Sequence, residues 1–358
     1  MRPPATIPVQ GSVTEAIEPS PDPRLAQLQA WLRASLGHGS WSLTPASSDA
    51  SFRRYFRVHL DKPDQQGRAT LIVMDAPPDK EDCRPFVSIA TLLAGAGVHV
   101  PHIIDPDVGN GFLLLSDLGS TTYLDALQQP EQADRLYLQA IDALVAIQKA
   151  SRPGVLPAYD RPLLERELQL FPEWYIAKQL GVTLDEAGQT LLRAAFDAIL
   201  ENNLAQPAVY VHRDYHSRNL MVAEPNPGIL DFQDAVHGPI TYDLVSLLRD
   251  AYIAWPEEQV IDWCVRYWEK ARAAGLPVDG DFGAFYRDFE WMGAQRQLKV
   301  LGIFARLCHR DGKQAYLKDQ PLVMHYLRKT CERYRQLGPL AELLDTLSPQ
   351  DSRSGFTF

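Results

Sequence analysis

One stretch of the chain gathers residue types that could hold a metal ion and accept a proton. The segment VHRDYHSRNLMV, residues 211–222, contains Asp214 and, five positions later, Asn219. A second carboxylate, Asp231, lies in GILDF, residues 228–232. Carboxylate and amide oxygens ligate Mg²⁺, and a carboxylate can also orient a hydroxyl and accept its proton. These residues therefore fit a metal-assisted reaction of a hydroxyl group, in which the protein positions the reactants and neutralises charge.

The pattern H-x-D-x-x-x-x-N is weak when taken alone, because His, Asp and Asn are ordinary turn residues. Its context makes it more specific. Residues 209–212 (VYVH) and 219–222 (NLMV) are apolar enough for strands on either side, and Asp231 ends a third apolar run. We interpret the segment as a catalytic turn between short strands.

The elements before this turn predict a small lobe built on an antiparallel sheet. Four strand-like runs are expected, and a turn-rich loop, DKPDQQG at 61–67, joins the second to the third as a hairpin. Residues 85–97 predict a helix ended by glycines. A helical leucine spacing at 24–36 precedes the sheet. The four runs are WSLTPA (41–46), RRYFRVHL (53–60), ATLIVMDA (69–76) and GFLLLSDLG (111–119).

Beyond residue 120 long helical periodicities predict a larger, mainly helical lobe. They cover residues 133–148, 162–180 and 185–204, and helices continue to about residue 345. The expected organisation is α+β and bilobal. Its parts are a flexible N-terminal tail (1–23), an N-lobe (24–118), a C-lobe with the catalytic turn (119–345), and a C-terminal tail (346–358).

Composition narrows the class of partner. The chain has 358 residues, 46% of them hydrophobic and 22% charged, which is typical of a globular protein. Its formal net charge of -10 argues against nucleic acid and favours a small-molecule partner. The sequence shows no membrane-spanning run. Its four cysteines show no Cys-x-x-Cys pairing, so we expect reduced thiols and a cytoplasmic protein of unknown oligomeric state.

A sheet lobe joined to a helical lobe that carries this turn resembles a protein kinase. The segments VHRDYHSRN, ILDFQDAVHGPITYDL and FLLLSDLG resemble the aminoglycoside phosphotransferase branch of that superfamily, over about residues 45–310. The segments SSDASFRRYFRV, LIVMDAPP, CRPF, ELQLFPEWY and LDFQDAVHGP are similar to bacterial kinases that phosphorylate the anomeric hydroxyl of N-acetylmuramate and N-acetylglucosamine in peptidoglycan recycling.

This resemblance implies a protein-kinase-like fold, ATP and Mg²⁺ as cofactors, and a sugar 1-phosphate as product. It makes the N-lobe (24–118) the nucleotide-binding lobe and places the sugar site in the C-lobe (119–345). Asp214 would face the acceptor hydroxyl, while Asn219 and Asp231 would hold the metal. The connector around Asp117 and Gly119 would lie against the adenine of ATP.

The N-lobe departs from the kinase pattern, because the run TLIVMD has no lysine to anchor phosphates and the following helix has no matching glutamate. Arginines can hold phosphate oxygens bidentately, so Arg53, Arg54 or Arg57 is expected to substitute. Strand alternation puts Arg53 and Arg57 on one face and Arg54 on the other, and does not say which face looks into the cleft. The turn with Ser51 could add backbone N–H groups.

Candidates for acceptor binding come from the turn and from the helical lobe. His216 and Arg218 lie inside the turn, Glu165 and Trp174 lie in LLERELQLFPEWY, and Asp234 follows the metal residues. Asp243 is interpreted as a structural cap or brace. A kinase of another small hydroxyl substrate, such as an aminoglycoside or a small amine alcohol, stays open as an alternative, as does a catalytically silent nucleotide-binding protein.

Overall fold

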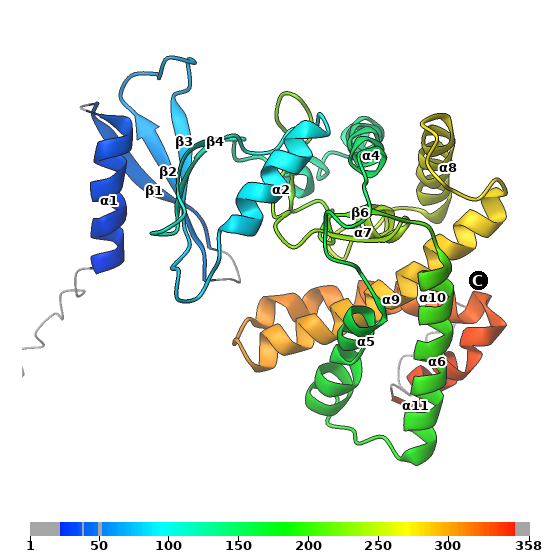
Figure 1. Cartoon of the computed structure of the whole chain (residues 1–358). Coiled ribbons are helices and arrows are strands. Elements are labelled where there is room, and N and C mark those ends of the chain that lie inside the picture. Colours follow the sequence, from blue (N-terminus) through cyan, green and yellow to red (C-terminus); the bar gives the residue numbers. More distant parts are fainter. Residues whose placement is uncertain (1–21, 38, 49–51, 348–358) are drawn as a thin grey trace, which may run out of the picture.

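The computed structural model describes residues 22–37, 39–48 and 52–347, and these form two lobes (Figure 1). Nearly all of both predicted tails and Ser51 lie outside the described residues. The α+β bilobal architecture predicted from the sequence is confirmed. None of the helices in the described ranges is long and apolar enough to cross a membrane.

The N-lobe is built on one antiparallel sheet with the strand order β1-β2-β3-β5-β4. Strand β4 was not predicted, because its sequence IIDPD contains a proline and two aspartates. β4 lies at the edge of the sheet. An edge strand tolerates a proline, because the missing N–H leaves no carbonyl of a neighbouring strand without its hydrogen bond. The strands are β1 (Trp41–Ser48), β2 (Arg54–Leu60), β3 (Thr70–Asp75), β4 (Ile103–Asp107) and β5 (Phe112–Ser116).

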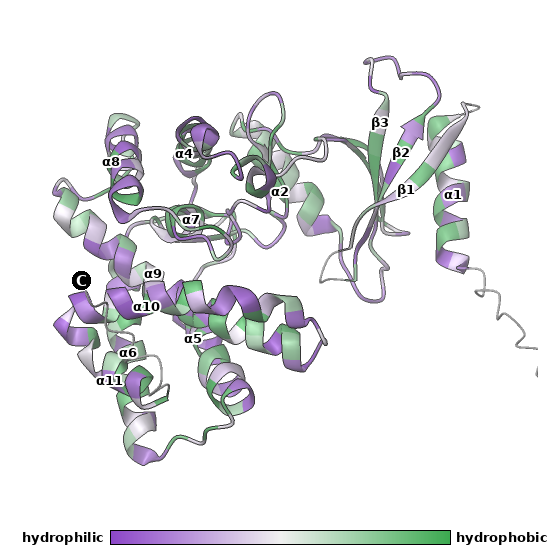
Figure 2. Ribbon diagram, turned by 180° about the vertical axis from the view of Figure 1, so that it is seen from behind, coloured by the Kyte–Doolittle hydropathy of each residue, from purple (hydrophilic) through white to green (hydrophobic). Residues whose placement is uncertain are grey.

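Helix α1 (Pro23–Leu36) covers one face of this sheet. It begins at the N-cap Asp22, whose carboxylate accepts the backbone N–H groups of Arg24 and Leu25. Hydrophobic and hydrophilic residues alternate along α1, as expected for an amphipathic helix (Figure 2). Its buried Leu28 and Leu32 pack in a hydrophobic cluster with residues of β2, β3 and β5.

Helix α2 (Arg84–Gly95) lies between the sheet and the C-lobe (Figure 1). Its Phe86 packs on Phe232 of the C-lobe, with ring centroids 4.8 Å apart. After the helix, the carbonyl of His99 accepts the backbone N–H of Ile229 at 2.8 Å. The apolar residues of α2 therefore share a core with the C-lobe, and α2 joins the two lobes.

The C-lobe is mainly helical. Its long α9 runs through the middle of the lobe. Gly302 lets α9 approach the start of η2 (Phe171–Gln179) closely, because a Cβ at Gly302 would lie 2.4 Å from the backbone of Leu170, the residue before η2. The helices are α3 (Tyr123–Ala126), α4 (Ala133–Lys149), α5 (Arg161–Leu168), α6 (Glu186–Ala205), α7 (Tyr242–Leu248), α8 (Glu257–Ala273), α9 (Phe282–His309), α10 (Gln320–Arg333) and α11 (Gly338–Leu347).

Shorter helical turns complete the lobe. They are η1 (Pro130–Gln132), η3 (Gln314–Asp319), η4 (Arg335–Leu337) and the wider, π-helical η2 (Phe171–Gln179). The single helix predicted over 162–180 is therefore α5 followed by η2. Pro172 stands at the start of η2 and has no N–H to donate, which favours the change of winding there.

Two small antiparallel strand pairs hold the predicted catalytic turn. β6 (Ala208–Val211) pairs with β9 (Val236–Pro239), and β7 (Leu220–Met221) pairs with β8 (Gly228–Ile229). The three strands predicted around the turn are confirmed, although β7 and β8 are shorter than predicted. β9 was missed, because its sequence VHGP contains both a glycine and a proline.

Candidate active site

The catalytic turn runs from the end of β6 to the start of β7, and its backbone adopts a demanding conformation. Arg213 has a φ of 78°, in the left-handed region that residues with a Cβ rarely adopt. Asp231, just after β8, has a φ of 62°. Such backbone costs about 1–3 kcal/mol per residue and persists where the surrounding structure imposes it, often at functional sites.

His212 supports the turn from behind. Its ring Nε2 bonds to the carbonyl of Leu230 at 2.9 Å, and its Nδ1 accepts the backbone N–H of Asp214 at 3.3 Å. This pair of bonds requires a neutral ring that carries its proton on Nε2. Burial lowers the pKa of His212 to about 4, so the ring is neutral at physiological pH.

Asp243, in the first turn of α7, supports the same backbone from the other side. Its two carboxylate oxygens accept the N–H groups of His212, at 2.6 Å, and Arg213, at 3.0 Å. The prediction of a brace is confirmed, whereas the alternative of a helix cap is wrong, because α7 has no side-chain cap.

Asp214, Asn219 and Asp231 come together at the cleft. The side-chain amide of Asn219 donates to the carbonyl of Asp214 at 3.0 Å and to the Asp231 carboxylate at 3.3 Å. Gln233 donates to the other Asp231 oxygen at 2.7 Å. With its nitrogen so used, the Oδ1 of Asn219 accepts no hydrogen bond from the described part of the chain. The Oδ1 of Asn219 and the neighbouring carboxylate of Asp231 are oxygen donors that suit a hard cation such as Mg²⁺.

The charges around Asp214 keep it ionised. Burial alone would raise its pKa, but positive groups, chiefly Lys299 of α9, hold the pKa of the carboxyl below its ordinary value. Lys299 bonds to the hydroxyl of Tyr242 at 2.9 Å and lies 3.2 Å from the buried carboxylate of Glu167. Asp214 is therefore a carboxylate at neutral pH, able to accept a hydrogen bond from a hydroxyl.

A cleft of about 570 Å³ opens above these residues, between the two lobes. Side chains and backbone from both lobes and from the connector line it. Among them are seven residues predicted for the site, together with Arg57 of β2. The seven are Asp117, Gly119, Asp214, His216, Arg218, Asn219 and Asp231.

The three arginines predicted to hold phosphate occupy different places, and each already has a carboxylate partner. Arg57 lines the cleft, where its guanidinium binds both oxygens of Asp117, at 2.6 and 3.1 Å, and the carbonyl of Gly119 at 2.8 Å. Arg53 pairs with Glu81 at 3.1 Å, just before α2. Tyr55, on the Arg57 face, also lines the cleft, so the structure settles which face of β2 looks inward.

Arg54 does not reach the cleft. It pairs with the fully buried carboxylate of Asp75, at 2.6 Å, and with Asp22 at the start of α1. Arg24 of α1 binds the other oxygen of Asp75 at 2.8 Å. Arg54 thus ties α1 to the sheet, on the face opposite to Tyr55, and its position does not support the predicted contact with nucleotide.

The predicted acceptor-binding residues divide into two groups. His216 and Arg218 line the cleft, and Arg218 stacks on Tyr252 with its guanidinium carbon 3.6 Å from the ring centre. The other three lie elsewhere. Glu165 is half-buried and pairs with Arg161, and Trp174 packs against the core of the helical lobe. Asp234 is exposed, between β8 and β9.

Some residues of the site were not identified from the sequence. Lys299 and Arg296 lie on α9, far along the chain from the catalytic turn, and Tyr252 follows α7. Glu167 lies in the segment LLERELQLFPEWY, two residues after the predicted Glu165. It accepts the hydroxyl of Tyr159 and pairs with Arg213 and Lys299. The sequence offered one signal for Lys299 and Arg296: four of the five residues at 295–299 are polar or charged, in the middle of a long helix that the structure shows to be buried there.

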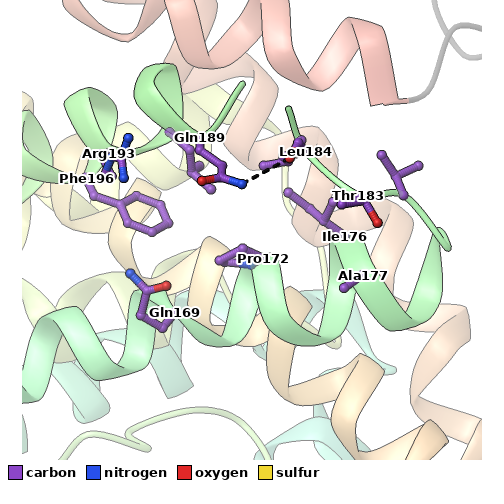
Figure 3. Close-up of a pocket in the computed structure, with 11 residues that line it drawn as sticks. Gln169, Pro172, Ile176, Ala177, Thr183, Leu184, Gln189, Arg193 and Phe196 are labelled. Atoms are coloured by element: carbon purple, nitrogen blue, oxygen red, sulfur yellow. Dashed lines mark hydrogen bonds between the residues drawn. The ribbon is translucent and has the colours of Figure 1, made fainter. Parts of the chain in front are cut away.

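A second cavity, of about 460 Å³, lies between η2 and α6 (Figure 3). Pro172 and Ile176 face Phe196 across it, and Gln189 donates to the carbonyl of Leu184 at its rim at 3.1 Å. None of the residues of the catalytic turn lines it. Its place within the helical lobe separates it from the candidate active site.

The bilobal fold and the turn define the class of kinase-like phosphotransferases. Residues 42–276 match the model of the phosphotransferase enzyme family, and the chain belongs to this family. It is 54% identical to the N-acetylmuramate/N-acetylglucosamine kinase of Pseudomonas aeruginosa over 94% of this chain and 100% of that protein. It is 50% identical to the protein of the same name from Neisseria meningitidis, over 94% and 99% of the two chains.

Solved structures with similar folds are more distant in sequence. A choline/ethanolamine kinase family protein from Mesorhizobium loti superposes with a TM-score of 0.58 at 15% identity, covering 89% of this chain and 99% of that one. The ADP-bound aminoglycoside phosphotransferase APH(2'')-Ib gives a TM-score of 0.56 at 14% identity, covering 85% and 98%. These matches show a shared kinase-like fold.

Proposed function

We propose that the protein is an ATP-dependent kinase that phosphorylates the anomeric hydroxyl of N-acetylmuramate, N-acetylglucosamine or both, as in peptidoglycan recycling. The observation that carries this proposal is the meeting of Asp214, Asn219 and Asp231 at one cleft, in a chain 54% identical to a relative of that name. The four free cysteines fit a cytoplasmic location.

ATP is proposed to lie between the lobes, with its adenine against the connector at Asp117 and Gly119. Asn219 and Asp231 would hold Mg²⁺, a cation that usually takes one or two protein oxygens and completes its shell with phosphate and water. When bound, the metal shields the negative phosphate oxygens and favours attack by another oxygen nucleophile.

Asp214 is proposed to orient the acceptor. Its carboxylate accepts a hydrogen bond from the anomeric hydroxyl, which is more acidic than an ordinary sugar hydroxyl because the ring oxygen withdraws charge. The anomeric oxygen forms a bond to the γ-phosphorus of ATP as the bond from that phosphorus to the β,γ-bridging oxygen breaks. The hydroxyl proton passes to Asp214, and ADP leaves with the bridging oxygen.

The charges near Asp214 separate this proposal from an aminoglycoside kinase. Aminoglycosides are polycations and need acidic groups around the acceptor. Here Lys299, Arg296 and Arg218 bring positive charge to the region of Asp214, His216 and Tyr252, and the buried Asp250 brings negative charge to His216 and Tyr252. Because cations accompany the carboxylates there, a neutral or anionic acceptor is favoured over a polycation.

The test incubates the protein with Mg-ATP and separate acceptors, and follows products by phosphorus NMR. N-acetylglucosamine and N-acetylmuramate should give 1-phosphates, whereas the 1-O-methyl glycoside of N-acetylglucosamine has no anomeric proton and should stay unphosphorylated. Equal reaction of the methyl glycoside would show that another hydroxyl is the acceptor. If kanamycin or choline reacted and neither sugar did, the proposal would be wrong.

A further inference from the structure

Arg296, in the middle of α9, is an unusual buried cation. Its side chain is 5% exposed, and it forms no hydrogen bond or ion pair with any residue in the part of the chain that the structure describes. None of its nitrogens is fully enclosed, so the guanidinium reaches the small open space that remains. Burying a charge without a partner opposes folding, which points to a functional reason for this arginine.

The neighbours of Arg296 on α9 show which way it faces. Lys299, three residues later, bonds to Tyr242 at 2.9 Å, at the start of α7. Phe304, eight residues later, packs on Tyr252 with ring centroids 6.0 Å apart. At 100° per residue, Arg296 lies between the directions of these two side chains. It therefore faces the region where α7 and Tyr252 meet the catalytic turn.

Electrostatic effects agree with this placement. Three residues of the cleft, Asp214, His216 and Tyr252, all sense the positive charge of Arg296. Asp214 is the proposed base for the acceptor hydroxyl. Arg296 itself is not one of the residues that line the cleft, so its guanidinium lies beside the acceptor side, next to where the sugar is proposed to lie.

Nearby cations are already engaged. Lys299 and Arg213 both pair with the buried carboxylate of Glu167, at 3.2 and 2.5 Å. Arg218 stacks on the ring of Tyr252 at 3.6 Å. Arg296 acts through space on the carboxylates of Asp214 and Asp243, whose pKa values it lowers, but none of the described residues forms a hydrogen bond or ion pair with its guanidinium. The guanidinium can therefore still contact an anionic ligand.

We propose that Arg296 binds a carboxylate on the acceptor and thereby favours N-acetylmuramate over N-acetylglucosamine. The two sugars share the ring, the acetamido group and the anomeric hydroxyl, and N-acetylmuramate adds a lactyl ether that ends in a carboxylate. A guanidinium can bind a carboxylate through two parallel hydrogen bonds. A chain with a net charge of -10 needs a local cation to admit an anionic sugar beside ATP. The inference rests on the proposed sugar-kinase function.

The experiment compares three acceptors with the full-length protein and its Arg296→Met variant. The acceptors are N-acetylmuramate, the neutral amide of its lactyl carboxyl group, and N-acetylglucosamine. Arg287→Met is the matched control, because Arg287 lies on the same helix, is exposed, and stacks on Trp291. Arg296→Lys keeps the charge and loses the planar fork. Thermal unfolding checks that each variant is folded.

For Arg296→Met the ratio of kcat/KM for N-acetylmuramate to that for N-acetylglucosamine should fall roughly tenfold to a hundredfold, as for loss of a hydrogen bond to a charged group. The wild type should phosphorylate N-acetylmuramate more efficiently than its neutral amide, and Arg296→Met should lose that preference. The ratio for Arg296→Lys should lie between those of the wild type and Arg296→Met, and the ratio for Arg287→Met should equal that of the wild type. Equal losses on all three acceptors, or no loss, would overturn the inference while leaving the sugar-kinase function in place. A wild type inactive on every acceptor would instead overturn that function.

Discussion

The carboxylate of Asp243 accepts the backbone N–H groups of both His212 and Arg213, at 2.6 and 3.0 Å. These two residues immediately precede Asp214, and Arg213 has a φ of 78°. A side chain 0% exposed therefore fixes the backbone that aims the proposed base. Burial raises the pKa of the Asp243 carboxyl to about 7, because its effect outweighs that of the two hydrogen bonds, which lower the pKa.

Asp243→Asn should impair both folding and turnover. The asparagine can accept one of the two N–H groups, and its NH₂ leaves the other without an acceptor. An unsatisfied buried donor destabilises by about 1–3 kcal/mol, and a misplaced Asp214 should lower kcat about tenfold or more. Chemical denaturation and steady-state kinetics measure the two effects. Asp234→Asn, at an exposed position of the same segment, is the control, and matching values for both variants would contradict the brace.

His212 should make the stability of the protein depend on acidity. Its folded pKa of about 4 lies below the ordinary value of 6.5, so the folded state binds fewer protons than the unfolded state between those values. The stabilisation is complete above pH 6.5 and is lost as the pH falls towards 4. In His212→Gln the free energy of unfolding should fall less steeply over this range, by roughly 3 kcal/mol at most.

Urea denaturation at pH 7.5, 6 and 5 measures this effect. The control is His325→Gln, since His325 is exposed on α10 and should leave the wild-type slope unchanged. Parallel curves for wild type and His212→Gln would show that the histidine is not buried as a neutral ring.

Asp214→Asn and Asp231→Asn should separate two roles. Loss of a positioned base should lower turnover roughly a hundredfold or more while ATP and sugar still bind. Loss of the Asp231 charge should instead raise the Mg²⁺ concentration needed for half-maximal rate. Calorimetric binding of ATP and a magnesium titration of the rate distinguish the two variants. A fully active Asp214→Asn, or an unchanged magnesium requirement in Asp231→Asn, would remove the corresponding assignment.

The catalytic turn could be predicted from the sequence because its residues are close together in the chain and its strands are apolar. Lys299 and Arg296 could not, since they reach Asp214 through the packing of α9 on α7, which no local pattern encodes. Strands β4 and β9 were missed for a related reason. Their prolines oppose strand formation locally, and the pairing partner that overrides this preference is supplied by β5 or β6.

The arginines of β2 provide the last prediction, because two of them lie on opposite faces of the same strand. Arg57 faces the cleft and holds Asp117 and Gly119 of the connector, so Arg57→Met should raise the KM for ATP roughly fivefold or more by releasing that segment. Arg54 binds the buried Asp75 beneath α1. Arg54→Met should lower the free energy of unfolding by about 1–3 kcal/mol, with Arg24 still on Asp75, and should change the KM for ATP less than twofold. Kinetics at saturating sugar and urea denaturation on both variants test this division. If Arg54→Met raised the KM for ATP more than Arg57→Met, the nucleotide would contact the other face of the strand, and the placement of ATP against Asp117 and Gly119 would be wrong.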